Sequence, residues 1–377
     1  MSIEIRRVNT RHERKQFIKF AWKVYRNDPE LNRHWVPPVI SDYMKTLDTE
    51  YYPLYDHADL AMFTAWKDGV MVGTIAAIQN RRHNQIHQDK VGFWGFFECL
   101  NDQKVADALF EAAAMWLRSK GLDAMRGPIS PSMNDQCGML TRGYDSSPVF
   151  LMLYNPPYYN DLCLNNGQKV AQELLAWYID QKIIDIERLR RIAQHVMKRE
   201  GLSVRILDMK NFDSEVRKMR EIYNGAWEKN WGFVPMTDKE FDFLATSLKS
   251  IANPHYVYFV ENREGKTIGF SLSLPDINQA LKHVNGNPFT PWGLVKYLWY
   301  KRNITMVRTI VMGVLPEYRN KGIDSIMNVQ IADYGGKHGV FASEMSWILK
   351  SNEAMSKLAL VIGGKPYKEY AIYEKAI

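Results

Sequence analysis

The sequence predicts an α/β (α+β) protein of two similar units in tandem, each a mixed β-sheet flanked by helices. Three observations support this prediction: each half begins with a strand and a helix, each repeats one hairpin signal, and each later has a helix that stops at a glycine. A chain of 377 residues is too long for one ordinary domain and suits two. With 46% hydrophobic residues, both units can form full cores.

Within each half, the period of the apolar residues distinguishes the first strand from the helix that follows it. In both halves a strand-like run precedes a helix-like one, at residues 3–8 and 12–25, and at 204–207 and 212–227. The hairpin signal that follows is an acidic residue and a glycine, two more residues, a β-branched residue and a second glycine. It occurs at residues 68–73 and 264–269.

The later helices and the length of the second half set the expected boundary. Helices over 105–119 and 324–334 each stop near a glycine. From the hairpin to this stop, the second half is about 22 residues longer than the first, and the extra residues lie within 278–303. A helix over 187–199 joins or opens the second unit. The domains are therefore expected at residues 1–182 and 183–377.

The composition of the chain indicates where the protein is located, whether it binds a metal and what charge its partner carries. No apolar run reaches the ~18 residues of a membrane span, and the N-terminus lacks a signal-peptide core, so a soluble, cytoplasmic protein is expected. The three cysteines and nine histidines show no metal-binding or disulfide spacing, so we expect no metal. The net charge of +7 favours an anionic partner. Because the basic residues are scattered, nucleic acid is not the expected one.

One strand, turn and helix stands out at residues 309–334. The first residues are β-branched and apolar, Leu315-Pro316 breaks the strand, and apolar residues then recur at helical spacing. A turn there aims backbone N–H groups and the positive end of the helix dipole beyond the strand, which makes a phosphate site. Gly322 allows close approach because it has no Cβ, and Arg319 and Lys321 add positive charge.

The run V-L-P-E-Y-R-N-K-G-I-D at 314–324 resembles the pyrophosphate loop of the GCN5-related N-acetyltransferases, Q/R-x-x-G-x-G/A. Arg319 and Gly322 match this pattern, whereas Asp324 replaces a small residue and also suits a helix N-terminus. The resemblance implies acetyl-CoA or a longer acyl-CoA as co-substrate. The residues that it implies for binding are Val314, Arg319, Asn320, Lys321, Gly322, Ile323, Asp324 and Asn352.

Two such units in tandem also resemble the N-myristoyltransferases and the Fem-type ligases. In the first half, residues 98–104 occupy the position of the phosphate loop but contain no glycine, so we expect CoA in the C-terminal unit only. The turn-rich stretch 127–135 is either a plain loop or a substrate wall presenting Asn134 and Asp135. In the second half, Glu228 and Asn230 are candidate ligands of the acceptor.

The catalytic candidates follow the second phosphate loop. Glu344 interrupts an apolar strand, so it is either a general base or a carboxylate at a strand edge facing water. The helix that starts at Asn352 resembles the family's N-x-x-A stretch, but the family's general-acid tyrosine aligns with Ala359. Its replacements would come from the last strand, where Tyr370 is the candidate selected and the alternatives are Tyr367 and Tyr373.

These features indicate an N-acyltransferase that uses a CoA thioester and a small-molecule or lipid-like amine acceptor. A Fem-like aminoacyl-tRNA-dependent transferase and a non-catalytic acyl-CoA-binding protein are the alternatives. The extra segment 287–302 combines aromatic residues with three cations. It is expected to be either a helix with aromatics facing the core, or an apolar lid whose basic edge meets a lipid headgroup and gives peripheral membrane contact.

Overall fold

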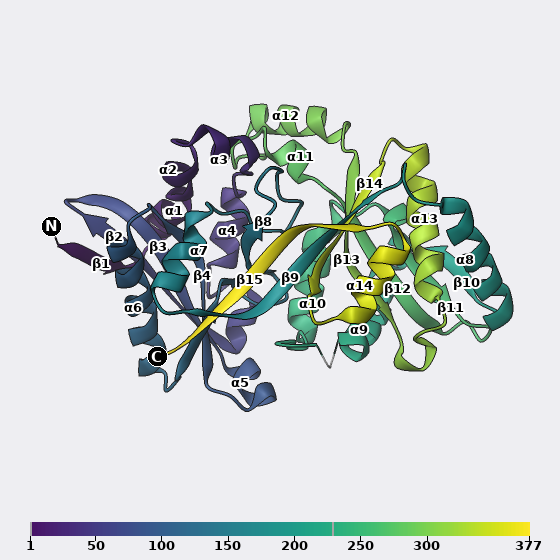
Figure 1. Cartoon of the computed structure of the whole chain (residues 1–377), viewed down its shortest axis with the longest axis horizontal. Coiled ribbons are helices and arrows are strands. Elements are labelled where there is room, and N and C mark those ends of the chain that lie inside the picture. The colour runs from purple at the N-terminus through teal and green to yellow at the C-terminus, as the bar shows by residue number, and fades with distance from the viewer. Residues whose placement is uncertain (1, 228–229) are drawn as a thin grey trace. The chain divides into compact units, whose positions relative to one another are not determined.

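The computed structural model describes residues 2–227 and 230–377 and confirms the mixed α/β fold class (Figure 1). The chain forms two compact units. Unit 1 comprises Met1–Leu174, Asn278–Lys301 and Lys368–Ile377, and unit 2 comprises Leu175–Ile277 and Arg302–Tyr367. The boundary near residue 182, inferred from sequence similarity between the halves, stays a prediction.

Unit 1 is built on a mixed sheet in the order β1-β2-β3-β4-β5-β15, with β8 also paired to β15. Only β4 and β5 are parallel among the pairs described within this unit. The strands are β1 (Ile3–Arg7), β2 (Ala58–Lys67), β3 (Val70–Asn80), β4 (Val91–Cys99), β5 (Ala124–Gly127), β8 (Met139–Arg142) and β15 (Lys365–Ala376). A separate ribbon pairs β6 (Ile129–Ser130) with β7 (Gln136–Cys137).

The helices of unit 1 come from its N-terminal stretch and from the segment Asn278–Lys301. They are α1 (Arg11–Lys19), α2 (Ala21–Tyr25), α3 (Pro29–His34), α4 (Ile40–Thr46), α5 (Arg81–His87), α6 (Gln103–Ser119), α7 (Tyr158–Asn165), α11 (Asn278–Leu281) and α12 (Pro291–Lys301). The predicted hairpin is confirmed, since Asp68 (φ 51°) and Gly69 (φ 76°) form the turn between β2 and β3. The three cysteines are all buried thiols.

Unit 2 has a sheet of β9 (Lys169–Asp180), β14 (Ala342–Leu349), β13 (Met306–Val314), β12 (Thr267–Pro275), β11 (Val257–Glu261) and β10 (Ser203–Ile206), in that order. Its helices are α8 (Ile186–Glu200), α9 (Phe212–Trp227), α10 (Asp238–Lys249), α13 (Ile323–Lys337) and α14 (Glu353–Val361). Short 3₁₀ turns occur at Met209–Asn211, Pro254–Tyr256 and Pro316–Tyr318 in this unit, and at Pro53–Asp56 in unit 1.

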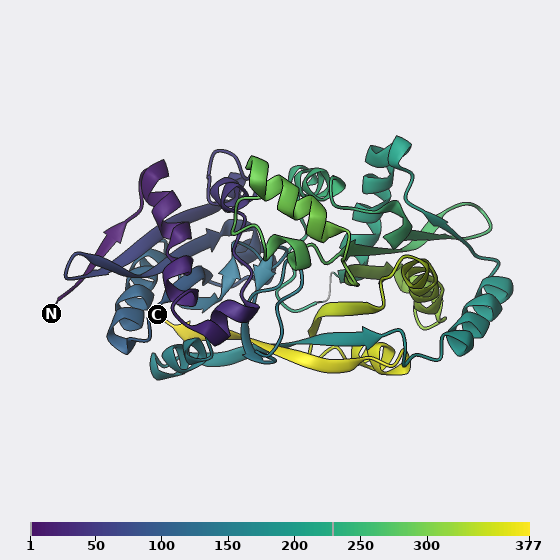
Figure 2. The same ribbon diagram turned by 90° about the horizontal axis from the view of Figure 1, so that it is seen from above.

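Helices cover both faces of the unit 2 sheet because the strands are apolar on both sides. One core cluster joins α8 and α13 to the sheet, and the other joins α9 and α10 to it. Helices α8 and α13 lie side by side in both views (Figures 1 and 2), and Arg190 of α8 is ion-paired with Asp333 of α13 at 2.6 Å. The helix expected over 187–199 is thus confirmed as α8.

The extra segment of the second half folds with unit 1. The backbone N–H of Ile40 donates to the carbonyl of Gly286 at 3.0 Å. The side chain of Asn285 accepts from Trp22 Nε1 at 2.6 Å and from Arg26 at 2.8 Å. Helices α11 and α12 are therefore anchored on α2 and on the start of α4.

The packing of α6 predicts a large loss of stability on truncation of Leu109. Leu109 is fully buried, and a Cβ on Gly73 of β3 would come within 2.6 Å of its Cδ1 atom. Leu109→Ala should lower the free energy of unfolding by about 2–5 kcal/mol, since it leaves a cavity. Met115 lies on the same helix but is 61% exposed, so Met115→Ala should change it by less than about 0.5 kcal/mol. Urea unfolding followed by circular dichroism measures both, and equal midpoints would contradict this packing.

Candidate active site

The first feature of the site in unit 2 is the divergence of two parallel strands. The register of β13 and β14 runs from Met306 opposite Ala342 to Thr309 opposite Met345. It ends there, although β13 continues to Val314 and β14 to Leu349, all within the described residues. The two strands are therefore no longer paired at their carboxyl ends.

A β-bulge lies at the point where the strands diverge. Leu272 of β12 pairs with Val311, and the next residue, Ser273, pairs with Thr309. Ile310 is thus the extra residue of β13, and a bulge interrupts the ladder of backbone hydrogen bonds at that point. Such a bulge offers a backbone N–H donor of the kind that polarises a thioester carbonyl.

The turn after β13 presents an open helix N-terminus. Asn320 (φ 61°) and Gly322 (φ 80°) both adopt left-handed conformations, and Gly322 is the N-cap of α13. A glycine has no side chain with which to cap the helix, so the first N–H groups of α13 point into the space before it. With the helix dipole, this turn has the properties of a phosphate site.

The charged side chains of this turn are partly engaged by their neighbours. Lys321 is ion-paired with Glu200 of α8 at 2.9 Å, and Arg319 donates to the carbonyl of Gly225 at 3.3 Å. Burial raises the pKa of Asp324, so this carboxyl holds a proton more readily than an exposed aspartate.

The other two residues implied for the cofactor lie on either side of this turn. Val314 ends β13 and is half-buried. Asn352 is the N-cap of α14, and its side chain accepts the backbone N–H of Met355 at 3.2 Å. The side chain of Asn352 therefore has a structural role as the cap of α14.

Glu344 is completely buried in β14, at 0% exposure, so the alternative of an edge carboxylate facing water is wrong. The hydroxyl of Tyr367 donates a hydrogen bond to Glu344 Oε2. Arg308 of β13, also buried, lies at the same register as Glu344. Its guanidinium donates to the Oγ and carbonyl of Ser346 at 2.9 and 3.0 Å. A carboxylate, a tyrosine and an arginine thus line the start of the splay.

Tyr367 is the tyrosine of the last strand that contacts Glu344. Tyr370 and Tyr373 belong to unit 1, where Tyr370 lies opposite Leu140 of β8 and is buried. The hydroxyl of Tyr373 donates to Asn160 at 2.7 Å. Sequence reasoning had retained Tyr367 as an alternative and had missed Arg308, whose charge in an otherwise apolar strand was an available signal.

Unit 1 has a similar pair of diverging strands, but its own chain lies against them. The parallel register of β4 and β5 ends at Phe93 opposite Arg126. The backbone N–H of Phe96, at the bulge of β4, donates to Ser130 Oγ at 2.9 Å. A Cβ on Gly95 would come within 1.9 Å of the carbonyl of Ile129, so β6 lies directly on this strand.

The helix N-terminus of unit 1 is closed as well. Asp102, the N-cap of α6, accepts the N–H of Lys104 at 3.0 Å and is ion-paired with Lys67 at 2.9 Å. Its carboxylate occupies the place where α13 of unit 2 has only a glycine. An anionic ligand would meet this negative charge at the start of α6.

The predicted acceptor ligands are spread over both units. In unit 1, Asp135 accepts hydrogen bonds from Ser132 at 2.6 Å and from Tyr52, and the N–H of Asn134 donates to Ser132. In unit 2, the N–H of Asn230 donates to the carbonyl of Trp227 at 2.8 Å. Glu228 lies outside the described residues.

Among residues 2–227 and 230–377, no group of His, Cys, Asp and Glu side chains is arranged to hold a metal ion. Within the same ranges, no helix is both long and apolar enough to cross a bilayer.

Comparison with known proteins gives relatives over the whole chain, although no family model matches it. The chain is 33% identical to the bacterial ceramide synthase of Caulobacter vibrioides, over 98% of this chain and 96% of that protein. It is 32% identical to Protein YghO of Escherichia coli, over 99% and 95%. A tandem GNAT protein from the clavulanic acid biosynthesis pathway has the same fold, with a TM-score of 0.59 at 10% identity, over 100% of this chain and 98% of that one. The chain therefore belongs to the family of Protein YghO and the bacterial ceramide synthase, and it has the fold of the tandem GNAT protein.

Proposed function

We propose that this protein is an N-acyltransferase that transfers an acyl group from a CoA thioester to a lipid-like amine. The observation that carries the proposal is the arrangement in unit 2, where the splay of β13 and β14 leads to the open N-terminus of α13. Two strands that part beside a turn suited to phosphate match a long ligand with a pyrophosphate near one end. Acyl-CoA has this form.

In this proposal the turn at Arg319–Gly322 binds the pyrophosphate through backbone N–H groups. The pantetheine arm lies between the two strands, and an N–H near the bulge at Ile310 holds the thioester carbonyl. The acceptor nitrogen attacks the carbonyl carbon, the new C–N bond forms and the C–S bond breaks. Since both reactants are held beside these strands, proximity supplies much of the rate.

The proton released by the amine has a route through two buried groups. Glu344 accepts it, directly or through a water chain, and the Tyr367 hydroxyl already donates to Glu344. Tyr367 can pass its proton to the departing thiolate and recover one from Glu344. The relay leaves both side chains in their starting states, and it would replace the family's tyrosine at the position of Ala359.

The acceptor is proposed from the whole-chain relative called a bacterial ceramide synthase. A ceramide is the amide of a fatty acid and a long-chain amino alcohol. We therefore propose a long-chain amino alcohol, or a similar lipid-like amine, as acceptor and a longer acyl-CoA as donor.

The substrate class can be tested by mass spectrometry of the products. The protein should convert a long-chain amino alcohol and palmitoyl-CoA to the amide, and activity should rise steeply as either chain lengthens, because each buried CH₂ contributes about 0.8 kcal/mol. A flat response from acetyl- to palmitoyl-CoA would return the protein to acetyl transfer onto a soluble amine. Tight CoA binding without turnover would identify an acyl-CoA-binding protein. Transfer only from charged tRNA would identify the aminoacyl transferase alternative.

The phosphate turn can be tested with two glycines of the same helix. Gly322 (φ 80°) begins α13 and Gly339 (φ 77°) follows its end, so Gly322→Ala and Gly339→Ala carry similar backbone strain. Only Gly322→Ala alters the turn whose N–H groups would bind the pyrophosphate, and its methyl group would also meet Val196 Cγ2 at 3.3 Å. This variant should weaken CoA binding by about tenfold or more. Calorimetry should also give one CoA per chain. Equal affinities of the two variants, or two CoA per chain, would disprove the assignment.

The proton relay can be tested against a matched pair in unit 1. Glu98 also accepts a hydrogen bond from a tyrosine, Tyr159, at 2.7 Å, and burial raises the pKa of Glu98 to about 8. Glu344→Gln and Tyr367→Phe should each lower kcat by roughly 10²–10⁴-fold with little change in CoA affinity. Glu98→Gln and Tyr159→Phe should leave kcat unchanged. Full activity of Glu344→Gln across the pH range would remove Glu344 from the mechanism.

A further inference from the structure

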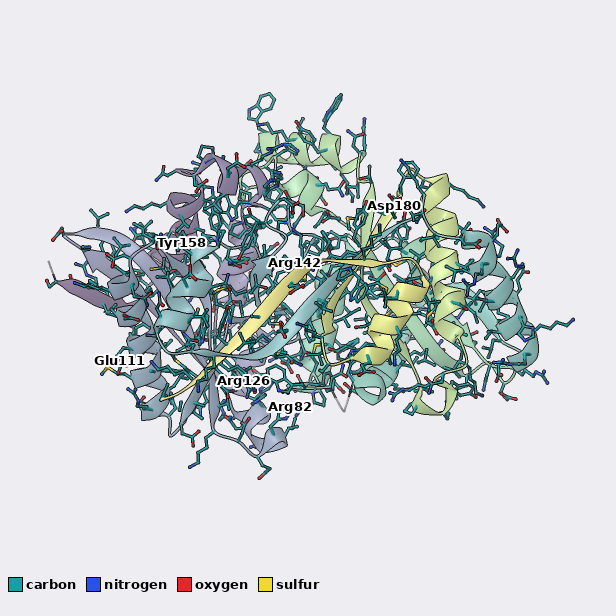
Figure 3. All side chains as sticks on the ribbon, viewed as in Figure 1. Arg82, Glu111, Arg126, Arg142, Tyr158 and Asp180 are labelled. Carbon is teal, nitrogen blue, oxygen red and sulfur yellow. The ribbon has the colours of Figure 1, made fainter. Side chains whose placement is uncertain are left out.

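Helix α12 of unit 1 carries large apolar side chains that face solvent. Trp292 is 80% exposed, Trp299 is 65% exposed, and Phe289, just before the helix, is 75% exposed. Leu294, Val295 and Leu298 are exposed as well. The expectation that these aromatics face the core is therefore wrong. Figure 3 shows side chains of α12 extending away from the ribbon.

The opposite face of α12 holds the helix on unit 1. Gly293 is buried, and a Cβ there would come within 1.9 Å of the carbonyl of Asn287. Tyr300 stacks on His283, with ring centroids 3.7 Å apart. At 3.6 residues per turn, Gly293, Tyr297 and Tyr300 share one face, and the exposed apolar residues span roughly 160° on the other. The helix is thus attached through a narrow stripe and presents its broad apolar face outward.

Two lysines border this apolar face. By helical spacing, Lys296 lies at one edge and Lys301 at the other. An apolar face between rows of cations is the arrangement of a helix that lies in the plane of a membrane interface. Tryptophan is also the residue type that favours the headgroup level of a bilayer.

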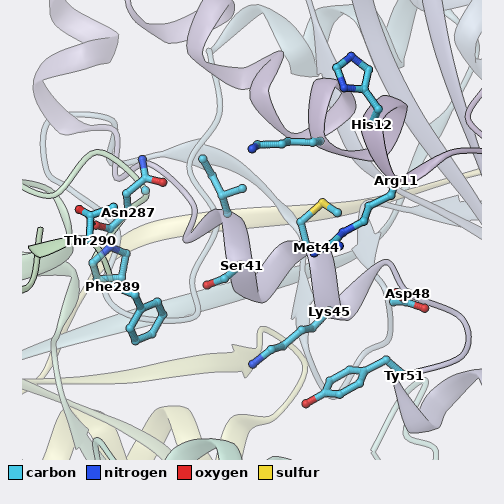
Figure 4. A pocket seen from close by; sticks show the side chains of 14 residues that line it. Arg11, His12, Ser41, Met44, Lys45, Asp48, Tyr51, Asn287, Phe289 and Thr290 are labelled. Carbon is cyan, nitrogen blue, oxygen red and sulfur yellow. The ribbon is translucent and has the colours of Figure 1, made fainter.

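A basic pocket lies beside the start of α12, in the same unit. It has a volume of about 870 Å³ and is lined by Arg11, Lys15 and Lys45 as well as by Phe289. Its one acidic lining residue, Asp48, is ion-paired with Arg14 at 2.8 Å. Figure 4 shows Phe289 on one side of the pocket and Lys45 on the other. The surface next to the apolar face is therefore positively charged.

We propose that unit 1 binds an anionic phospholipid bilayer, with Phe289 and the outer face of α12 inserted at headgroup level. The flanking lysines and the basic pocket would then face lipid phosphates. An apolar face of this size on one helix needs a partner, and the charge beside it selects an anionic one. The proposal goes beyond acyl transfer and does not depend on it.

A second copy of this chain is a less suitable partner for the same surface. Two-fold pairing of α12 with itself would place the Lys296 and Lys301 edges of one copy against those of the other, and like charges in contact oppose association. A bilayer containing anionic lipid meets both the apolar and the charged parts of the surface.

Sedimentation with vesicles tests this proposal on the full-length protein. Wild type should bind vesicles of equal phosphatidylcholine and phosphatidylglycerol, and bind phosphatidylcholine vesicles more weakly. The variant W292A/W299A should bind roughly tenfold or more weakly to both, since two inserted aromatic side chains are lost. The variant W292F/W299F should keep most of the binding. The variant K296A/K301A should lose affinity for the anionic vesicles alone. Added salt should narrow the difference in affinity between this variant and wild type, because salt screens the attraction of the lysines to lipid phosphates.

The control variant V70A/M115A removes two other apolar side chains of unit 1 that are more than half exposed but lie outside this surface. It should bind vesicles as wild type does. Equal binding by W292A/W299A and wild type, or absence of binding by wild type, would overturn the proposal. A lipid-free dimer that W292A/W299A abolishes, seen by light scattering, would also overturn it and assign the surface to a second copy.

Discussion

The candidate site depends on how unit 2 accommodates buried charge between two strands. Arg308 and Glu344 lie at the same register of β13 and β14, and neither faces solvent. Buried charges are costly unless hydrogen bonds satisfy them, and here Ser346 and Tyr367 supply those bonds. The strands separate directly after this polar group. The buried polar group and the end of strand pairing therefore lie next to each other in unit 2.

The two units share one architecture, but the strand bulge and the helix N-terminus are covered by other residues in unit 1 and lack that cover among the described residues of unit 2. Both have a parallel strand pair that diverges beside a bulge and a helix that starts nearby. In unit 1, β6 and Ser130 cover the bulge, and Asp102 caps the helix. In unit 2, a left-handed glycine begins the helix. A few local contacts thus distinguish the two copies, while the sheet is kept.

The sequence was a good guide wherever local chemistry decided the structure. The hairpin turns and helices α6, α8, α9 and α13 follow their patterns because glycine, capping residues and apolar period act over a few neighbours. Contacts between distant segments were not predictable in this way. The composition of 287–302 left a helix with buried aromatics and an apolar lid as alternatives, and it could not show which unit would hold the segment or which face would remain exposed.

The tyrosine beside Glu344 illustrates the same limit within one strand. Tyr367 and Tyr370 are three residues apart in β15, so strand alternation places them on opposite faces. Alternation alone does not say which face meets Glu344. That choice depends on the register of the sheet, which nonlocal pairing sets. Arg308 was recognisable by its charge, but its partner Ser346 was not.

The path of the chain between the units has a consequence for their independence. Unit 1 is assembled from three separate stretches of sequence and unit 2 from two, so the backbone passes between them four times. No single peptide bond divides one from the other. A single cut within residues 175–367 would leave two fragments that each contain parts of both units. The first unit cannot be completed during synthesis until the last ten residues, Lys368–Ile377, have left the ribosome. Each unit therefore depends on segments of the chain that lie on both sides of a segment of the other unit in the sequence.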